Sequence, residues 1–271
     1  MKSRILVACI GIPLLLVVLL LCPPICLPIV LAMLCGLAVH ELLYTTGYVK
    51  KASMLFFTDV VAVLVPFWYY FGCSTLGAVS ILALFLMALS GCAIASGQTV
   101  TFGQISACLF GGVLIPMMLS TFVLLRDLPH AKFYLLLPFV SAFSSDAFAL
   151  FAGMAFGKHK LAPVLSPKKT IEGSVGGFFG SVLCCILYGL VISIGFQGHV
   201  NYAVLVLYGL VGSLVSQLGD LSFSYIKREF AIKDYGHLMP GHGGVLDRFD
   251  SVIFCAPVTY VMVSLLPFFQ F

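Results

Sequence analysis

The chain has 271 residues, of which 61% are hydrophobic and 9% charged, and its formal net charge is +4. Ordinary soluble domains carry roughly 25% charged residues, so this composition excludes a soluble globular fold and indicates that lipid is the main solvent. The positive charge is not gathered into a basic patch interleaved with aromatic residues, so we expect no nucleic acid partner.

Long apolar runs recur from one end of the chain to the other. A hydrocarbon core about 30 Å thick takes about 20 helical residues to cross. The sequence therefore predicts an all-α integral membrane protein with about nine transmembrane helices, at approximately 5–21, 25–44, 53–71, 75–95, 105–125, 133–156, 175–196, 202–221 and 251–268. The first run resembles a signal peptide, but no cleavage motif follows it, and we interpret it as a retained span.

The basic residues predict how these spans are oriented. With the N-terminus in the cytoplasm, nine spans leave only Arg126 and Lys132 outside, and the other twelve Lys and Arg residues face the cytoplasm. This distribution satisfies the positive-inside rule. We therefore expect a protein of the cytoplasmic membrane whose two long polar loops, 157–174 and 222–250, lie on the cytoplasmic side.

Ten cysteines lie in or beside the apolar runs, without C-x-x-C spacing and without clustered histidines. Metal ligation or disulfide formation would call for such groupings. We interpret the cysteines as small apolar side chains that fill space within the spans.

Four carboxylates fall inside predicted spans, where a charge costs about 2.5 to 3.5 kcal/mol on insertion scales. In the predicted topology Glu41, Asp59, Asp146 and Asp220 all lie in the cytoplasmic half, which predicts a polar cavity open to the cytosol. For Asp146 we expect a ligand or metal role, the alternative being a polar packing cluster with the two preceding serines. For Asp59 and the His40–Glu41 pair we favour interhelical bonds or a place at the membrane interface.

The loop before the seventh span has the features of an anion site. Pro167 presents Lys168 and Lys169, while Ser166 and Thr170 add hydroxyl donors beside an expected helix start. A helix N-terminus offers free N–H groups and a favourable dipole to an anion. The alternative is that the lysines only anchor the loop on the cytoplasmic side.

A second candidate phosphate site lies in the last polar loop. The segment PGHGG at 240–244 has little side-chain bulk, so its backbone N–H groups can approach a ligand. Asp220 and Asp247 bracket this loop, and magnesium that serves phosphates takes one or two carboxylates. The alternative is a flexible turn followed by a solvated charge run.

The residues of this last loop and its flanks resemble the signature of the phosphatidate cytidylyltransferases, also called CDP-diacylglycerol synthases. The matching positions are Ser224, Lys227, Arg228, Lys233, Asp234, Gly236, Pro240, His242, Gly243, Gly244, Asp247, Arg248 and Asp250. The upstream segment 156–177 is also similar to the family, so the likeness covers roughly the last half of the chain. Two positions depart from it, because Phe223 stands where a glutamate is usual and Leu150 where a tyrosine is expected.

The resemblance implies transfer of the cytidylyl group of CTP to phosphatidate, giving CDP-diacylglycerol and pyrophosphate in phospholipid biosynthesis. It also implies magnesium, leaves a monovalent cation open, and suggests a homodimer. Residues 1–132 would form a helical scaffold and residues 133–271 the catalytic region.

The resemblance also implies roles for individual residues. Asp220 and Asp247 would be metal ligands, and Asp146 would bind substrate. The cations that would bind phosphate are Lys168, Lys169, Lys227, Arg228, Lys233 and Arg248. His242, Gly243 and Gly244 would shape the triphosphate cradle, with Ser166 and Thr170 as hydrogen-bond donors. Asp234 and Asp250 would orient neighbouring Lys and Arg side chains.

Two other functions are compatible with a polar site in a membrane helix bundle. A CTP-dependent lipid-alcohol kinase, of the dolichol or phytol type, would release CDP instead of pyrophosphate. An ion-coupled transporter would use buried aspartates along a pathway, but it predicts charges in both halves of the membrane. The predicted placement of the four carboxylates in one half favours an enzyme.

Overall fold

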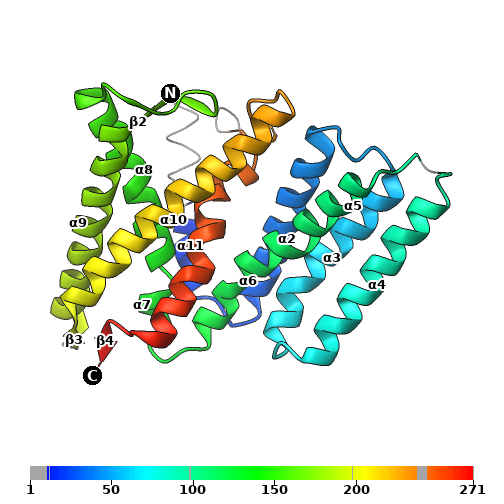
Figure 1. Ribbon diagram of the computed structural model, residues 1–271. Coiled ribbons are helices and arrows are strands. Elements are labelled where there is room, and N and C mark those ends of the chain that lie inside the picture. The colour runs from blue at the N-terminus through cyan, green and yellow to red at the C-terminus, as the bar shows by residue number, and fades with distance from the viewer. Residues whose placement is uncertain (1–10, 12, 98, 197, 237–242, 271) are drawn as a thin grey trace. The chain divides into compact units, whose positions relative to one another are not determined.

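The computed structural model describes residues 11, 13–97, 99–196, 198–236 and 243–270, and they are mostly helical (Figure 1). Eight helical segments among these residues are long and apolar enough to cross a membrane. They correspond to the second through ninth predicted spans, and the predicted fold class, an all-α integral membrane protein, is confirmed. Much of the first predicted span lies outside the described residues.

The chain forms two compact units. The first unit comprises Met1–Leu124 and Ile232–Phe249, and the second comprises Leu125–Ala231 and Asp250–Phe271. The segment Ile232–Phe249, which contains residues 240–244 (the glycine-rich loop), thus belongs with the N-terminal helices, far away in sequence.

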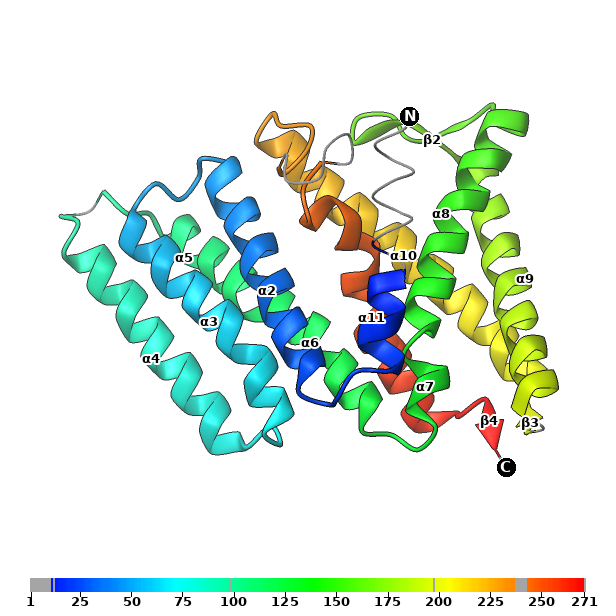
Figure 2. The ribbon, with the colours of Figure 1, turned by 180° about the vertical axis from the view of Figure 1, so that it is seen from behind.

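The first unit is built from the N-terminal spans (Figure 2). Its elements are α2 (Cys26–His40), the π-helical turn η1 (Glu41–Thr45), α3 (Ala52–Tyr70), α4 (Thr75–Ile94), α5 (Phe102–Leu109), the π-helical turn η2 (Phe110–Leu114) and most of α6 (Ile115–Arg126). Helix α3 packs against α2, α4 and η2. The contact with η2 is close, because a Cβ atom at Gly112 would lie 2.7 Å from the Thr58 side chain.

The second unit contains the remaining spans and two short hairpins. Its elements are α7 (Ala131–Tyr134), α8 (Leu137–Phe156), β1 (Lys160–Ala162), β2 (Ser166–Thr170), α9 (Ile171–Phe196), β3 (His199–Val200), α10 (Tyr202–Glu229), most of α11 (Leu246–Leu265) and β4 (Phe269–Gln270). Strand β1 pairs antiparallel with β2, and β3 pairs antiparallel with β4. Helices α8, α9 and α10 pack against one another.

Small and hydroxyl residues explain the close packing of these three helices. A Cβ atom at Gly173 of α9 would lie 2.7 Å from the backbone oxygen of Ala149 in α8. Between α8 and α10, the Ser145 and Ser213 hydroxyl oxygens are 2.8 Å apart. Between α10 and α9, Gln217 Nε2 donates to the backbone oxygen of Ser174 at 3.2 Å. Small residues that let backbones approach, joined by buried hydrogen bonds, are typical of helix association in lipid.

Several helix ends differ from the predicted spans. Helix α9 begins at Ile171, α10 continues beyond the predicted end at Leu221 to Glu229, and α11 begins at Leu246 instead of residue 251. The predicted loop 222–250 is therefore shorter, because its first and last residues are helical. The charges explain the difference, since Lys227 and Arg228 in a last turn and Asp247 in a first turn complement the helix dipole.

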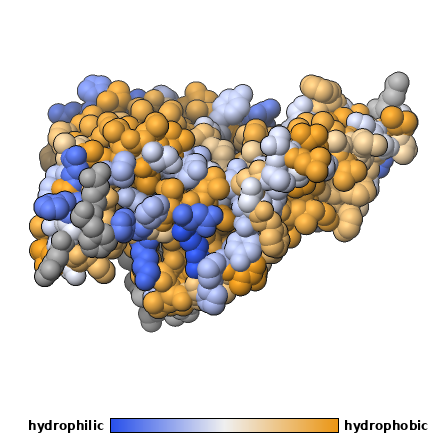
Figure 3. Space-filling model, turned by 90° about the horizontal axis from the view of Figure 1, so that it is seen from below, coloured by the Kyte–Doolittle hydropathy of each residue, from blue (hydrophilic) through white to orange (hydrophobic). Residues whose placement is uncertain are grey.

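The surface is rich in large apolar side chains. Hydrophobic residues cover much of the face seen in Figure 3. On α4, Leu76 is 79% exposed and Ile94 is 83% exposed. Monomeric soluble proteins rarely expose apolar patches of this extent, whereas lipid solvates them.

Candidate functional site

Three helices of the second unit bring carboxylates together. Asp146 lies on α8, Asp220 on α10 and Asp250 near the start of α11. Asp250 is only 8% exposed and interacts electrostatically with the other two carboxylates and with Lys227. We call Asp146, Asp220, Asp250, Lys169 and Lys227 the charge cluster. Such grouping is expected, because charged side chains within membrane spans pair with one another or line a functional cavity.

Serine side chains and backbone groups hold the acids of the charge cluster. The N–H of Ser251 donates to Asp250 Oδ1 at 2.7 Å, and Ser251 Oγ is 3.4 Å from Asp146 Oδ2. On α10, Ser224 Oγ donates to Asp220 Oδ1 at 3.2 Å, one helical turn away. These bonds orient each carboxylate on its helix.

The β1–β2 hairpin supplies one lysine of the cluster. Lys169 Nζ lies 2.5 Å from Asp220 Oδ2, and both side chains are about one quarter exposed, at 26% and 25%. Arg228 Nε donates to the backbone oxygen of Leu165, between the two strands, at 3.0 Å. The hairpin is therefore joined to the C-terminal part of α10 by two bonds. Lys168, next to Lys169, is exposed.

The base of the hairpin is closed by residues at the start of α9. Thr170 Oγ1 accepts the N–H of Gly173 at 3.1 Å, which caps the helix. Glu172 accepts the backbone N–H groups of Lys158 at 3.1 Å and His159 at 3.2 Å. The expected helix start beside the lysines is confirmed, while the predicted role of Thr170 in binding phosphate remains a prediction.

In the first unit, two carboxylates hold the residues that flank the glycine-rich loop. Asp247 is 9% exposed, and its Oδ2 accepts the N–H groups of Tyr235 at 2.8 Å and Gly244 at 3.0 Å. Glu41 Oε2 accepts the N–H of Leu246 at 3.0 Å. The N–H of Gly244, which we expected to face a triphosphate, thus binds a carboxylate of the protein itself. His242 lies outside the described residues.

The predicted site residues are divided between the two units. Lys168, Lys169, Asp146, Asp220, Lys227, Arg228 and Asp250 belong to the second unit, together with Ser166 and Thr170. Asp247 belongs to the first unit with Lys233, Asp234, Gly243, Gly244 and Arg248. Pairing of Asp220 with Asp247 on a metal ion stays a prediction. Within the described residues, no three His, Cys, Asp or Glu side chains form a group that could hold a metal ion.

Some contacts of the candidate site were not predicted from sequence. The ion pair of Lys169 with Asp220 and the bond from Glu41 to Leu246 both join residues that are far apart along the chain. The only sequence signal for Glu41 was a carboxylate inside a span. For its neighbour, the expected interhelical bond is confirmed, because His40 Nδ1 lies 2.8 Å from Asp59 Oδ2.

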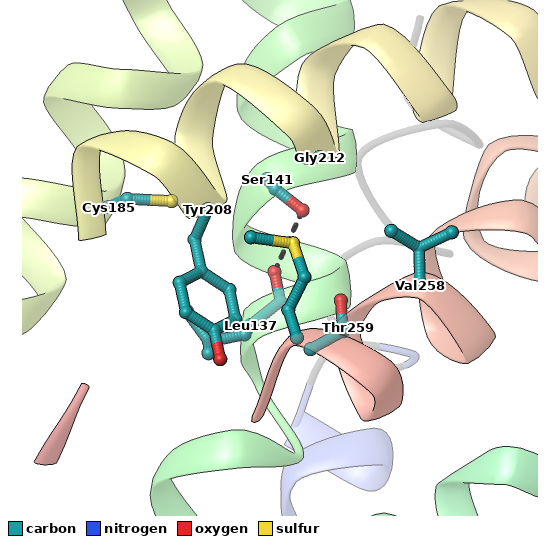
Figure 4. A pocket seen from close by; sticks show the side chains of 8 residues that line it. Leu137, Ser141, Cys185, Tyr208, Gly212, Val258 and Thr259 are labelled. Carbon is teal, nitrogen blue, oxygen red and sulfur yellow. Dashed lines mark hydrogen bonds between the residues drawn. The ribbon is translucent and has the colours of Figure 1, made fainter. Parts of the chain in front are cut away.

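A small cavity lies among α8, α9, α10 and α11 of the second unit (Figure 4). Its lining consists of Leu137, Ser141, Cys185, Tyr208, Gly212, Val258, Thr259 and Met262. None of these residues is Asp, Glu, Lys, Arg or His. Ser141 Oγ donates a hydrogen bond to the backbone oxygen of Leu137 at 3.0 Å. This cavity does not include the charge cluster, and the polar cytoplasmic cavity remains a prediction.

The two departures from the resembled signature have clear structural settings. Phe223 is 1% exposed, and its ring meets that of Phe254 edge-on, with the ring centroids 6.1 Å apart. An apolar contact between α10 and α11 thus replaces a carboxylate. Leu150, on α8, is 60% exposed.

Comparison with known proteins connects this geometry to a family. A family model described as the cytidylyltransferase family matches residues 2–266. The chain is 46% identical over 130 residues to a phosphatidate cytidylyltransferase of Staphylococcus epidermidis, covering 48% of each chain. It is 38% identical over 162 residues to that of Rickettsia felis, covering 59% of this chain and 71% of the relative. It is 37% identical over 169 residues to a phosphatidate cytidylyltransferase of Bacillus subtilis, covering 62% of this chain and 61% of the relative.

The helical membrane fold, with acids on three helices and lysines on α10 and the β1–β2 hairpin, defines an integral membrane protein with a polar site. The match over 2–266 shows more narrowly that the chain belongs to the cytidylyltransferase family. The aligned region spans about half the length of the Staphylococcus relative, at 48%.

Proposed function

We propose that this protein transfers the cytidylyl group of CTP to phosphatidate, producing CDP-diacylglycerol and pyrophosphate. The main support is the charge cluster of the second unit, where Lys169 pairs with Asp220 at 2.5 Å and Asp250 interacts with Lys227. A site of acids and ammonium groups on membrane helices suits a reaction between a lipid phosphate and a soluble nucleotide. The relatives named phosphatidate cytidylyltransferase point to the same substrates.

The chemical problem is repulsion between two anions. An oxygen of the phosphatidate phosphomonoester attacks the α-phosphorus of CTP, a new P–O bond forms, and the bond to the β-phosphate breaks to release pyrophosphate. The nucleophile is already ionised at neutral pH, so no strong general base is needed. The enzyme's task is to position the reactants and to offset their negative charge.

Residues of the charge cluster and its surroundings supply fixed positive charge. We assign phosphate binding to Lys169, Lys227 and Arg228, which lie on the hairpin and on the last turn of α10. The carboxylates of Asp220 and Asp250 keep the ammonium groups in place before substrates arrive. Lys168, which is exposed on the hairpin, would meet the nucleotide from solvent. Lys233 and Arg248 are exposed residues of the first unit, and phosphate binding by them stays a prediction from the sequence.

The acids also fit magnesium. Asp250 interacts with two carboxylates and one ammonium group, so a cation nearby would relieve repulsion. Magnesium on phosphate substrates uses one or two protein carboxylates and retains waters, so a group of three protein ligands is not required. We assign Asp220 of the second unit as one of its ligands, while Asp247, the other ligand expected from the sequence, belongs to the first unit. When bound, the ion would stabilise negative charge on the departing pyrophosphate.

The site is proposed to face the cytoplasm, where CTP is present. The basic residues of the hairpin and of the last turn of α10 would then lie beside the inner leaflet, in agreement with the positive-inside rule. We also propose a homodimer, in line with the resemblance.

The test is an assay of the purified full chain with CTP, phosphatidate and magnesium. The proposal predicts equal amounts of pyrophosphate and CDP-diacylglycerol. Release of CDP with phosphorylation of a lipid alcohol would instead identify a kinase, and the absence of any nucleotide turnover would refute the proposed function.

A further inference from the structure

The carboxylate of Glu41 contacts a helix start far away in sequence. Glu41 opens the π-helical turn η1 at the end of α2, and its Oε2 accepts the N–H of Leu246, the first residue of α11. The first N–H groups of a helix have no partner within the helix, and the dipole there favours negative charge. Glu41 therefore acts as a cap that is supplied by another helix of the first unit.

Two glycines leave the space that Glu41 occupies. A Cβ atom at Gly236 would lie 2.5 Å from Glu41 Oε1 and 2.8 Å from its carboxyl carbon. A Cβ atom at Gly244 would also overlap the Glu41 carboxylate. These glycines stand before and after residues 237–242 along the chain, and the same carboxylate lies beside both of them.

Asp247 binds backbone N–H groups at or beside the same two glycines. Its Oδ2 accepts the N–H groups of Tyr235 and Gly244. Together, Glu41 and Asp247 accept the backbone N–H groups of Tyr235, Gly244 and Leu246. A charged hydrogen bond contributes more than a neutral one, so the positions of these three backbone groups depend on both acids.

We infer that Glu41 is a positioning residue for Gly236, for Gly244 and for the first turn of α11, which carries Asp247. This inference rests on the proposed function and deepens it, because it assigns a role in nucleotide use to the N-terminal half of the chain. Glu41 itself does not touch the reacting atoms. It holds Gly244 and Leu246 in position for the binding of CTP.

The first test compares Glu41→Ala and Glu41→Gln with the wild type. Loss of a charged hydrogen bond predicts about a 10- to 100-fold fall in kcat/KM for CTP in Glu41→Ala. Glu41→Gln keeps a carbonyl acceptor for Leu246 and should fall between Glu41→Ala and wild type. Hydrogen–deuterium exchange should be faster at 235–246 in Glu41→Ala, with slower exchange restored in Glu41→Gln.

The second test uses Gly236, where the three atoms nearest to a Cβ position all belong to Glu41. Gly236→Ala alone should lower kcat/KM, because its new Cβ meets three Glu41 atoms. In the double variant Gly236→Ala, Glu41→Ala this overlap is absent, so activity should be no lower than in Glu41→Ala. Gly91→Ala is the matched control, since a Cβ there meets nothing within 4 Å, and its kinetics should equal those of wild type.

The outcomes separate this inference from the proposed function. If the wild type made no CDP-diacylglycerol, the function would fail, while the exchange comparison would still test the contact of Glu41. Wild-type kcat/KM and wild-type exchange in both Glu41 variants would overturn the inference. The inference would also be overturned if the Glu41 variants gave less folded protein but the folded protein had wild-type kcat/KM. If Glu41→Ala does not fold, Glu41→Gln and Gly236→Ala decide the question.

Discussion

Two neighbouring lysines of the β2 strand have different surroundings. Lys169 is about one quarter exposed and pairs with Asp220, whereas Lys168 is exposed to solvent. An exposed charge is screened by water and salt, and its single interactions are weak. The charge of Lys169, the less exposed lysine, should therefore matter more for the reaction than that of Lys168.

We expect Lys169→Gln to lower kcat/KM for CTP by about 10- to 100-fold, because it removes a charge-assisted interaction of about 1.5 to 3 kcal/mol. Lys168→Gln is the matched control and should change kcat/KM by only a few-fold. Steady-state kinetics in mixed micelles give both values. Equal effects of the two variants would show that the lysines act as a general positive surface.

At this scale the sequence predicted residue types better than residue contacts. Asp220 was predicted as a site residue because an acid inside a span is costly, and Lys169 because adjacent ammonium groups beside a helix start suit an anion. Their pairing could not be predicted, since it depends on how the β1–β2 hairpin docks on α10. The same limit applies to Glu41 and Leu246, which are separated by 205 positions.

Among the elements, α8 and α9 depend on small residues for their contact. Gly173 leaves no room for a Cβ atom, because such an atom would lie 2.7 Å from the backbone oxygen of Ala149. Backbone cannot move aside as a flexible side chain can. Gly195, near the other end of α9, has nothing within 4 Å of a Cβ position.

Gly173→Ala should therefore lower the free energy of unfolding by about 1 to 3 kcal/mol through overpacking. Gly195→Ala should be neutral or slightly stabilising, because alanine favours the helix more than glycine does. Equilibrium unfolding of the purified protein in detergent measures both. A destabilisation of similar size in Gly195→Ala would contradict this explanation, because a Cβ at Gly195 meets no atom within 4 Å and the loss could not come from overpacking.

The apolar runs predicted the existence and type of these helices well, since crossing lipid demands about 20 apolar residues. They predicted the ends less well. The hydropathy signal stops at Leu221, yet α10 continues through Lys227 and Arg228, because a helix can project beyond the hydrocarbon core. The glycines of α9, such as Gly173, Gly177 and Gly180, can be read from the sequence, but the helix that they contact cannot.

For the whole molecule, the central expectation is the direction in which the spans cross the membrane. Helix α10 offers a direct test because exposed residues stand at both ends, His199 before it and Glu229 at its last position. In a variant without native cysteines, His199→Cys should react with a membrane-impermeant thiol reagent in intact cells. Glu229→Cys should react only in inverted vesicles, and the reverse pattern would exclude a cytoplasmic site.

The composition was sufficient to predict the class of fold, since a chain with 9% charged residues cannot be stable as an ordinary soluble domain. The division into two units was not predictable in the same way. Ile232–Phe249 belongs with the N-terminal helices, in part through the bond from Leu246 to Glu41. Contacts between residues so far apart leave no local pattern in the sequence.

The fate of the CTP phosphates tests the account most directly. With phosphatidate and CTP labelled at the α-phosphate, the label should appear in the lipid product, and label at the γ-phosphate should appear in pyrophosphate. Asp220→Asn should reduce both by about 100- to 1000-fold, as expected for loss of an electrostatic group at the reacting phosphates, while Asp127→Asn, in an exposed turn, should not. Transfer of the γ-label to lipid, or full activity of Asp220→Asn, would contradict the account.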